Sequence, residues 1–350
     1  MSDTDPGRPT GPARHLDLAA LRAWLDTTRP GLVTGDLTAE RIVGGKSNLT
    51  YVLTDGAHRW VLRRPPIGHV LATAHDMGRE YTVLGALAPT AVPVPATVAH
   101  CPDPAVLGAP FYVMAHVDGT VYRSAAQTAG LDPARARTVA YALMDTLADL
   151  HDVDPAAVGL ADFGRPDGFL ARQLRRWRIQ LDASRGRDLP GIDELHAALA
   201  AAVPDSGRPA IVHGDYRLDN VLVSDRDGIA AVLDWEMATL GDPLTDLGVF
   251  LVYWTGLAHL PANAVSDAVG DNFPAGPELI DRYAARRDVD LSRLHWYTAF
   301  GFFKLAVIAE GIHHRYTAGQ TVGGGFDRIG EVVGPLVELG QAALAEDKGH

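Results

Sequence analysis

The chain has 350 residues, 47% of them hydrophobic and 21% charged, so it can bury a full core and is long enough for two domains or one large one. A formal net charge of −12 argues against nucleic acid or an anionic membrane as a partner, because both are bound by clustered Lys and Arg. The single cysteine, Cys101, excludes an internal disulfide framework and fits a cytoplasmic location, and the chain lacks the run of eighteen apolar residues that would predict a membrane span.

The first elements in chain order are a tail, a helix and a pair of strands. Residues 1–15 carry acidic residues and prolines, which predicts a disordered tail, and Leu16 to Leu25 has the spacing of a short amphipathic helix. The stretch "ERIVGGKSNLTYVL" contains Gly-Lys-Ser, but Glu40 stands where a P-loop has its first glycine, and strand-forming residues follow where a P-loop has a helix. It therefore predicts a strand, a glycine turn and a second strand that ends at Asp55-Gly56.

The segment that follows continues the β-rich part. "HRWVLRRPP" predicts a strand in which Trp60 and Leu62 share one face while Val61 and Arg63 share the other. "HDMGREYTVLGAL" has helical spacing and carries Glu80 beside its apolar stripe. "PFYVMAHVDG" predicts a buried strand that breaks at its Asp-Gly, where this part of the chain ends.

The remainder is predicted to be mostly helical. Helix signals occur in "DPARARTVAYALMDTLADLHDVD" and near Phe169–Leu181, Ile192–Ala201, Leu244–Tyr253 and Trp296–Tyr316. Two short apolar strands, "NVLV" and "AAVLDW", interrupt these helices and are joined by a turn at 225–228. Irregular backbone between rigid elements often carries chemistry, which directs attention to this interruption.

The segment "HGDYRLDN", His213 to Asn220, is the strongest motif in the chain. It places Asp215 and Asn220 five residues apart in front of an apolar strand, and Asp234 ends the next strand. Oxygen-bearing side chains placed in this way can meet at one Mg²⁺, which takes few protein oxygens and leaves other positions to water and phosphate. The spacing reproduces the H-x-D-x-x-x-x-N catalytic loop of protein kinases, in which Asp accepts the hydroxyl proton and Asn holds a metal.

Seven stretches carry a resemblance to a known family: "GGKSNLTY", "VLRRPP", "HDMGREYTVL", "FYVMAHVDG", "LADLHDVD", "HGDYRLDNVLV" and "VLDWEMATLGDPLTDL". On these stretches, over residues 30–320, the chain resembles the aminoglycoside phosphotransferase family of kinase-like enzymes. It most resembles the branch that includes the phosphotransferase domain fused to some acyl-CoA dehydrogenases. The resemblance implies an α+β, bilobal, protein-kinase-like fold. The expected N-lobe, residues 16–115, is an antiparallel sheet with one main helix. A hinge at 116–119 leads to a larger helical C-lobe at 120–343, and a tail at 344–350 follows.

The resemblance also implies residue roles. Asp215 would be the catalytic base or hydroxyl-positioning group, and Arg217 would neutralise charge on the moving phosphoryl group. Asn220 and Asp234 would ligate Mg²⁺. The residues implied in nucleotide binding are Gly45, Lys46, Ser47 and Asn48 over the phosphates, Arg63 with its helix partner Glu80, Val61 and Met114 against the adenine, and the backbone from Ala115 to Val117.

Two departures from the protein-kinase pattern bear on the expected site. Arg63 replaces the usual lysine, and a guanidinium still binds phosphate in a bidentate manner but is larger and keeps its charge. Asp234-Trp235-Glu236 replaces Asp-Phe-Gly, so the glycine that lets protein kinases switch is absent. We therefore expect a constitutively assembled site.

Several polar residues have a structural interpretation as good as a functional one. His213 is expected to hold the loop, and His151 to pack at a helix end. Asp242 is expected to be the N-cap of the helix after Pro243, and Asp246 to hydrogen-bond the catalytic-loop backbone or cap a helix. The role of Glu80 depends on whether Arg63 reaches it.

The leading functional hypothesis is transfer of the γ-phosphoryl group of ATP, with Mg²⁺, to a hydroxyl of a small molecule. The alternatives are a nucleotide-binding module without catalysis, of the pseudokinase kind, and a metal-dependent phosphoesterase, which would need more ligands than this segment supplies. The acceptor is open between a hydroxyacyl compound and an aminoglycoside- or macrolide-like alcohol. The sequence distinguishes neither ATP from GTP nor one oligomeric state from another.

Overall fold

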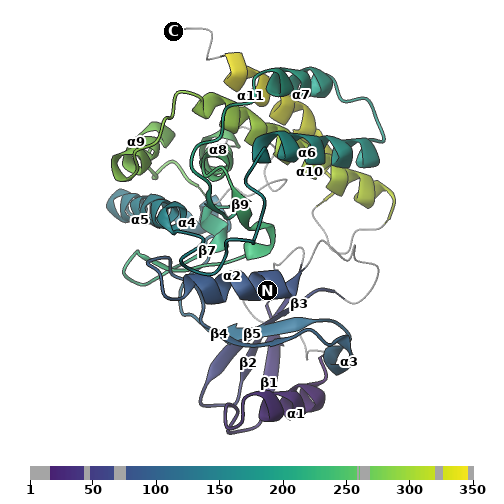
Figure 1. Ribbon diagram of the computed structural model, residues 1–350, viewed down its shortest axis with the longest axis vertical. Helices are drawn as coiled ribbons and strands as arrows, with labels where there is room; N and C mark the ends of the chain where they lie inside the picture. The colour runs from purple at the N-terminus through teal and green to yellow at the C-terminus, as the bar shows by residue number, and fades with distance from the viewer. Residues whose placement is uncertain are drawn as a thin grey trace, which may run out of the picture. The chain divides into compact units, whose positions relative to one another are not determined.

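The computed structural model describes residues 16–42, 48–66, 76–257, 260, 269–319 and 326–345 (Figure 1). The chain forms two compact units. The first unit is Met1–Asp118 together with Leu233–Glu236, and the second is Gly119–Val232 together with Met237–His350. The short segment that carries Asp234 therefore belongs to the first unit, although it follows a strand of the second.

The first unit is built on a five-stranded antiparallel sheet with the order β1-β2-β3-β5-β4. The strands are β1 (Thr38–Arg41), β2 (Leu49–Thr54), β3 (Arg59–Arg64), β4 (Thr97–Cys101) and β5 (Phe111–Ala115). The predicted turn at Asp55-Gly56 joins β2 to β3. The Asp55 carboxylate accepts hydrogen bonds from the backbone N–H of Ala57 and His58, and Gly56 has φ of +89°, which suits glycine.

The two faces of this sheet are covered by different helices. Helix α1 (Leu18–Thr28), N-capped by Asp17, packs its Leu21 and Leu25 into one core with Trp60 and Leu62 of β3. Helix α2 (Met77–Leu87), N-capped by Asp76, contacts β4 and β5 and pairs its Glu80 with Arg63 of β3. The predicted alternation along β3 is confirmed. A short helix, α3 (Pro104–Leu107), precedes β5.

The second unit is mostly helical. Its helices are α4 (Ala125–Thr128), α5 (Pro133–Asp152), α6 (Phe169–Ser184), α7 (Ile192–Ala201), α8 (Leu244–Leu251), α9 (Gly276–Arg286), α10 (Leu294–Thr317) and α11 (Val333–Ala345). Helix α10 is buried on nearly all sides and packs against α6, α8 and α11. It approaches α8 at Gly248, where a Cβ would lie 2.4 Å from the carbonyl oxygen of Tyr297, so only glycine permits this packing.

Two short antiparallel strand pairs frame the predicted catalytic loop. Strand β6 (Ala210–Val212) pairs with β9 (Thr239–Gly241), and β7 (Val221–Val223) pairs with β8 (Ile229–Val232). The register sets Val221 opposite Val232, so Asn220, just before β7, and the segment to Asp234, just after β8, leave the same end of this hairpin.

The predicted fold class, an antiparallel-sheet unit followed by a larger helical one in the kinase-like manner, is confirmed. The helix predicted at Leu244–Tyr253 is α-helical to Leu251 and continues as a π-helical turn over Val252–Gly256. Helix α11 runs to Ala345, two residues into the predicted tail, whereas residues 1–15 lie outside the described part. The sequence did not reveal β6, β9 or α9, because their hydrophobic patterns are too short or too polar.

Among the described residues, no helix has the length and apolar character that a membrane span requires.

Candidate active site

The catalytic loop runs from His213 to Asn220, between β6 and β7, and ends in a 3₁₀ turn at Leu218–Asn220. Gly214 has φ of +86°, and a Cβ there would lie 2.8 Å from that of Met237. A larger residue would meet both backbone strain and a clash. The glycine of "HGD" is therefore required by the shape of the loop.

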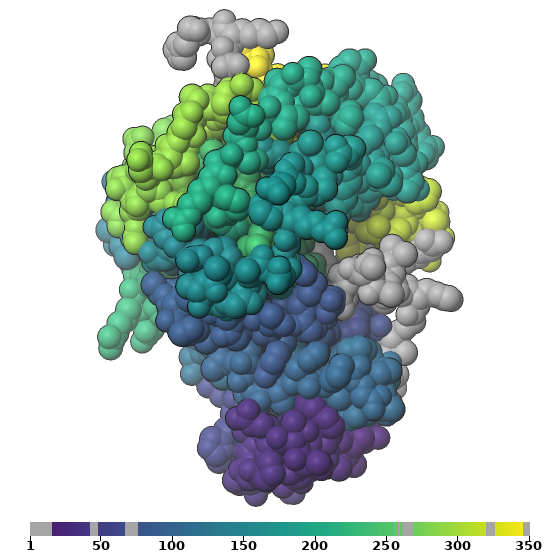
Figure 2. Space-filling view, in the orientation of Figure 1, coloured from purple at the N-terminus to yellow at the C-terminus, as the bar shows by residue number. Residues whose placement is uncertain are grey.

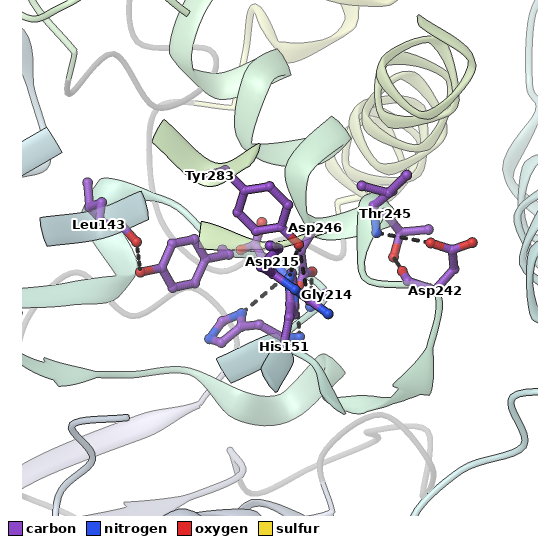
Figure 3. Close-up of polar contacts among 12 residues, drawn as sticks. Leu143, His151, Gly214, Asp215, Asp242, Thr245, Asp246 and Tyr283 are labelled. Carbon is purple, nitrogen blue, oxygen red and sulfur yellow. Dashed lines mark hydrogen bonds and ion pairs between the residues drawn. The ribbon is translucent and has the colours of Figure 1, made fainter. Parts of the chain in front are cut away.

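Asp246, in the first turn of α8, fixes the start of this loop. Its carboxylate accepts hydrogen bonds of 2.7 Å from the backbone N–H of His213 and from that of Gly214 (Figure 3). Behind it, the Nε2 of His151 lies 3.2 Å from Asp246, and the Nδ1 of His151 lies 2.8 Å from the hydroxyl of Tyr283. His151, expected only to pack, thus belongs to a buried polar chain that supports the loop.

The other structural residues behave largely as expected. His213 is fully buried and its Nδ1 accepts a hydrogen bond from the backbone N–H of Asp215. Asp242 lies one residue before the N-cap position and still accepts a hydrogen bond from the N–H of Leu244, while its other carboxylate oxygen accepts from the hydroxyl of Tyr297. Both residues shape the backbone around the loop.

Asp215 is surrounded by groups that favour its ionised form. The Nδ2 of Asn220 and the Nε of Arg217 lie 2.9 Å and 3.1 Å from its Oδ2, and its side chain is 23% exposed. Burial acts to raise the pKa of this carboxyl, but the charges of Arg217 and Lys304 outweigh burial, and the pKa lies below its usual value. Asp215 is therefore a carboxylate at neutral pH.

Lys304 is a site residue that sequence reasoning missed. It lies on α10, is buried, and its Nζ donates a hydrogen bond to the carbonyl oxygen of Gly214, 90 positions away in the chain. Its ammonium also lies 5.6 Å from the centre of the Trp177 ring. Burial lowers the pKa of Lys304, against the pull of Asp215. The only sequence signal was a charged residue inside the apolar run "FGFFKLAVIAEG".

Arg217 is held on three sides. Besides Asp215, its Nη1 pairs with Asp219 at 2.8 Å, and its guanidinium carbon lies 4.6 Å from the ring centre of Tyr253. A small pocket beside it, which includes Phe250 and Trp254 in its wall, has a volume of about 10 Å³, enough for about one water molecule. The aromatic side chains beside Arg217 thus leave little open space there.

In the first unit, Arg63 joins two acidic side chains. Its Nη2 donates a hydrogen bond of 2.8 Å to Asp234, and its Nε lies 3.3 Å from Glu80. The hydroxyl of Tyr112 donates a hydrogen bond of 2.9 Å to Oε2 of Glu80, the same oxygen that lies next to Arg63. Burial raises the pKa of Glu80 although Arg63 acts to lower it. Arg63 therefore reaches Glu80, as its proposed role requires, and a second acid as well.

Two features of this cluster suit a nucleotide. The guanidinium of Arg63 carries a positive charge between Glu80 and Asp234, and its Nε, 3.3 Å from Glu80, makes no hydrogen bond of good geometry among the described residues. Asp234 has φ of +65°, a left-handed conformation that costs free energy in a residue with a Cβ and that often marks functional sites. This backbone conformation sets the direction in which the Asp234 carboxylate points.

Hydrogen bonds of Asn48 to Glu236 and Glu80 extend this cluster within the first unit. Asn48 is buried, and its Nδ2 donates to Glu236 at 3.0 Å and to Glu80 at 3.4 Å. The side chain of Asn48 thus ties β2 to the segment after β8. Glu236 was noted in the sequence only as the replacement of a glycine, and its place in this cluster was missed.

The other predicted nucleotide contacts are only partly described. Val61 and Met114 are directly paired across β3 and β5 and are both buried. The backbone N–H of Ala115 donates to the carbonyl of Ala96, so this group is already used, whereas Val117 lies beyond the end of β5. The remaining predicted residues, Gly45, Lys46 and Ser47, lie outside the described ranges.

Asn220 and Asp234 carry the side-chain oxygens predicted to bind Mg²⁺, which prefers hard oxygen ligands. The hydrogen bonds of the Asn220 side chain to Asp215 are donated by its nitrogen, so its carbonyl oxygen is not used in them. The carboxylate of Asp234 is 29% exposed and bonds Arg63 through Oδ1. Each side chain therefore offers an oxygen of the kind that Mg²⁺ prefers. Within the described ranges, no group of three or more His, Cys, Asp and Glu side chains is arranged to hold a metal ion.

Comparison with known proteins identifies the family. Residues 38–295 match the model of the phosphotransferase enzyme family. The chain belongs to this family. Acyl-CoA dehydrogenase family member 11 of Rattus norvegicus is 34% identical over 338 residues, which are 94% of this chain and 43% of that protein. The chain thus spans less than half the length of this curated relative.

Solved structures agree with the family. A Ralstonia eutropha chain assigned to the aminoglycoside phosphotransferases is 32% identical, covers 95% of this chain and 99% of its own, and has a TM-score of 0.81. Aminoglycoside phosphotransferase APH(4)-Ia, crystallised with AMP-PNP and hygromycin B, is 13% identical, covers 95% of this chain and all of its own, and has a TM-score of 0.60, which shows the common fold. As a member of this phosphotransferase family, the protein is a small-molecule kinase.

Proposed function

We propose that the protein transfers the γ-phosphoryl group of ATP to a hydroxyl group of a small molecule, with Mg²⁺ as cofactor. The observation that carries this proposal is the environment of Asp215, a carboxylate kept ionised by Arg217 and Lys304 and held on a loop that Asp246 fixes. A group of this kind can orient a hydroxyl without being itself protonated.

In the proposed reaction, Asp215 accepts the hydrogen bond of the acceptor hydroxyl. The hydroxyl oxygen forms a bond to the γ-phosphorus as the bond from that phosphorus to the bridging oxygen of ADP breaks, and the hydroxyl proton passes to Asp215. Arg217 is placed to neutralise charge on the moving phosphoryl group. ADP leaves with the electron pair of the broken bond.

Nucleotide binding is proposed for the residues of the first unit. The positive charge of the Arg63 guanidinium supports a phosphate contact, and the paired Val61 and Met114 support an apolar contact to the base. Gly45, Lys46 and Ser47 are proposed to contact the phosphates, and the Val117 backbone to contact the adenine. Asn220 and Asp234 would hold Mg²⁺, which supplies positive charge that neutralises the phosphates.

For the acceptor, we propose a hydroxyacyl compound rather than an aminoglycoside. The rat relative carries the acyl-CoA dehydrogenase name, and the region next to Arg217 is lined by Phe250, Tyr253 and Trp254, which suit an apolar chain better than a polycation. Aminoglycoside and macrolide acceptors are the alternative that the other members of the fold suggest.

The test is the variant Asp215→Asn, with ATP hydrolysis and phosphoryl transfer measured against a panel of alcohols. Turnover should fall roughly a thousandfold, while the Kd for AMP-PNP with Mg²⁺ stays within about twofold, because the amide keeps the shape and loses the base. Full activity in this variant would exclude the assignment. Binding of AMP-PNP by the unmodified chain with no transfer to any alcohol would favour the pseudokinase alternative.

A further inference from the structure

Helix α6 carries a face of arginines next to an open groove. Arg172, Arg175, Arg176 and Ile179 follow the spacing i, i+3, i+4, i+7, which places them on one side of the helix. With Gln173 they line a groove of about 430 Å³. Arg175 and Arg176 are exposed, and Ile179 is 69% exposed. The teal segment that contains α6 forms part of the face drawn in Figure 2.

These arginines differ from their neighbours in having no acidic partner among the residues that the structure describes. Arg178 and Arg185 both pair with Asp193, at 2.5 Å and 2.8 Å. In the part of the chain that the structure describes, no ion pair joins the three groove arginines to an acid. The chain has 43 acidic residues and 31 Lys and Arg, so acids are not scarce. A cluster of uncompensated positive charge in such a chain is a site that an anion would occupy.

Arg172 is also fixed in place. Its guanidinium donates hydrogen bonds to the carbonyl oxygens of Arg165 and Asp167, in the loop before α6. A guanidinium held in one plane loses less conformational entropy when it binds an anion, and a planar fork matches the two oxygens of a phosphate or carboxylate.

The groove is connected to the catalytic loop through packed side chains of the same unit. Trp177, which follows Arg176, is buried, and its ring lies 5.6 Å from the ammonium of Lys304. Lys304 in turn donates its hydrogen bond to Gly214, the residue before Asp215. Helices α6 and α10 pack against each other, so the relation between the groove and the loop is fixed by the core of the second unit.

We propose that the groove on α6 binds an anionic group of the acceptor, a phosphate or a carboxylate, while the acceptor hydroxyl is held at Asp215. This inference rests on the proposed function and names the class of substrate: a hydroxylated organic anion. Ile179 is placed to contact an alkyl part of the same molecule. An aminoglycoside, which carries several ammonium groups, would be repelled by the groove arginines.

The first test measures anion binding directly. Inorganic phosphate is titrated by calorimetry at low ionic strength into protein saturated with AMP-PNP and Mg²⁺, so that the nucleotide site is filled. The double variant Arg175→Ala/Arg176→Ala is compared with Arg208→Ala/Arg226→Ala, which removes the same charge from two exposed arginines of the same unit outside α6. The α6 variant should bind phosphate at least about tenfold more weakly, and the control within about twofold of the unmodified chain. Equal weakening in both variants, or no measurable phosphate binding by the unmodified chain, would overturn the inference.

The second test measures whether the groove serves the reaction. Butane-1,4-diol and its monophosphate, 4-hydroxybutyl phosphate, present the same alcohol without and with an anionic group. In the α6 variant, kcat/KM for the monophosphate should fall at least about tenfold, while kcat/KM for the diol should stay unchanged. An equal fall for both acceptors would contradict the inference. If the unmodified chain phosphorylates neither alcohol, that result counts against the proposed function, and the phosphate titration still decides the inference.

Discussion

Two carboxylates that each face an arginine, one buried and one half-buried, are held in opposite ways. Burial raises the pKa of Glu80 in the first unit, and its cation, Arg63, is shared with Asp234. Burial acts on Asp215 in the second unit in the same direction, yet the pKa of Asp215 is lowered, because Arg217 and Lys304, together with the hydrogen bond from Asn220, favour the ionised form. The difference shows that the positive charges and donors around a carboxylate decide whether the loss of hydration is offset.

The comparison assigns different tasks to the two clusters. Glu80 accepts hydrogen bonds from Tyr112 and Asn48 and anchors Arg63, which is a positioning task. Asp215 is kept ionised at the end of a loop with a fixed backbone, which suits a group that receives a proton. The following variants test this division, from the largest expected effect to the smallest.

Arg63→Met should have the largest effect on stability. It leaves the buried Glu80 without its counter-charge and removes the partner of Asp234, and breaking a buried pair in this way costs about 3 kcal/mol of unfolding free energy. The KM for ATP should rise as well. Denaturant unfolding is compared with that of Arg59→Met, on the same strand, whose ion pair with Asp118 is exposed and should be worth less than about 1 kcal/mol. Similar losses in the two variants would mean that the Arg63 cluster is no stronger than a surface pair.

Lys304→Met should act on catalysis in the second cluster. Without the donor to the Gly214 carbonyl the loop shifts, and a shift of the positioned carboxylate should lower kcat about tenfold and leave the KM for ATP unchanged. Steady-state kinetics at varied ATP separates these two parameters. An increase in the KM for ATP with unchanged kcat would contradict the positioning role.

Glu80→Gln should be mild, in contrast to Asp215→Asn. The amide can still accept the hydrogen bond from Tyr112, so stability should change by about 1 kcal/mol or less and kcat by less than about threefold. The two isosteric changes are best measured side by side under the same conditions. If Glu80→Gln lowers kcat as far as Asp215→Asn does, the two carboxylates have the same task and the comparison is wrong.

His151→Gln tests the support behind the catalytic loop through pH. Burial lowers the pKa of His151 below its ordinary value of 6.5, so protonation favours the unfolded chain. The stabilising contribution is therefore complete above about pH 6.5 and decreases as the pH falls from there toward the folded-state pKa. The drop in Tm between about pH 7.5 and 5.5 should be smaller in the variant. An unchanged drop would assign the pH dependence to other groups.

Particular residues show which features of the structure could be predicted from the sequence. The family resemblance implied Glu80 as the helix partner of Arg63 and left open whether Arg63 reaches it, and the structure brings the two side chains together. The alternation in β3 and the Asp55-Gly56 turn were also predicted, because each depends on a few adjacent residues. Asn48 was predicted to lie over phosphates, but its side chain is buried against Glu236, since its direction is set by packing that its neighbours in sequence do not encode.

The sequence alone determined the eight-residue loop segment, the two strands of the hairpin that follows it and the family, because the spacing and the local backbone preferences are properties of contiguous residues. Only the tertiary structure decided which distant groups reach that loop: Lys304 from α10, and Asp246 with His151 behind it. It also decided that the arginines of α6 line a groove and form no ion pair with an acid of the described part of the chain. The physical reason is that charge balance and burial depend on neighbours in space, and helix packing selects these neighbours from segments far apart in the chain.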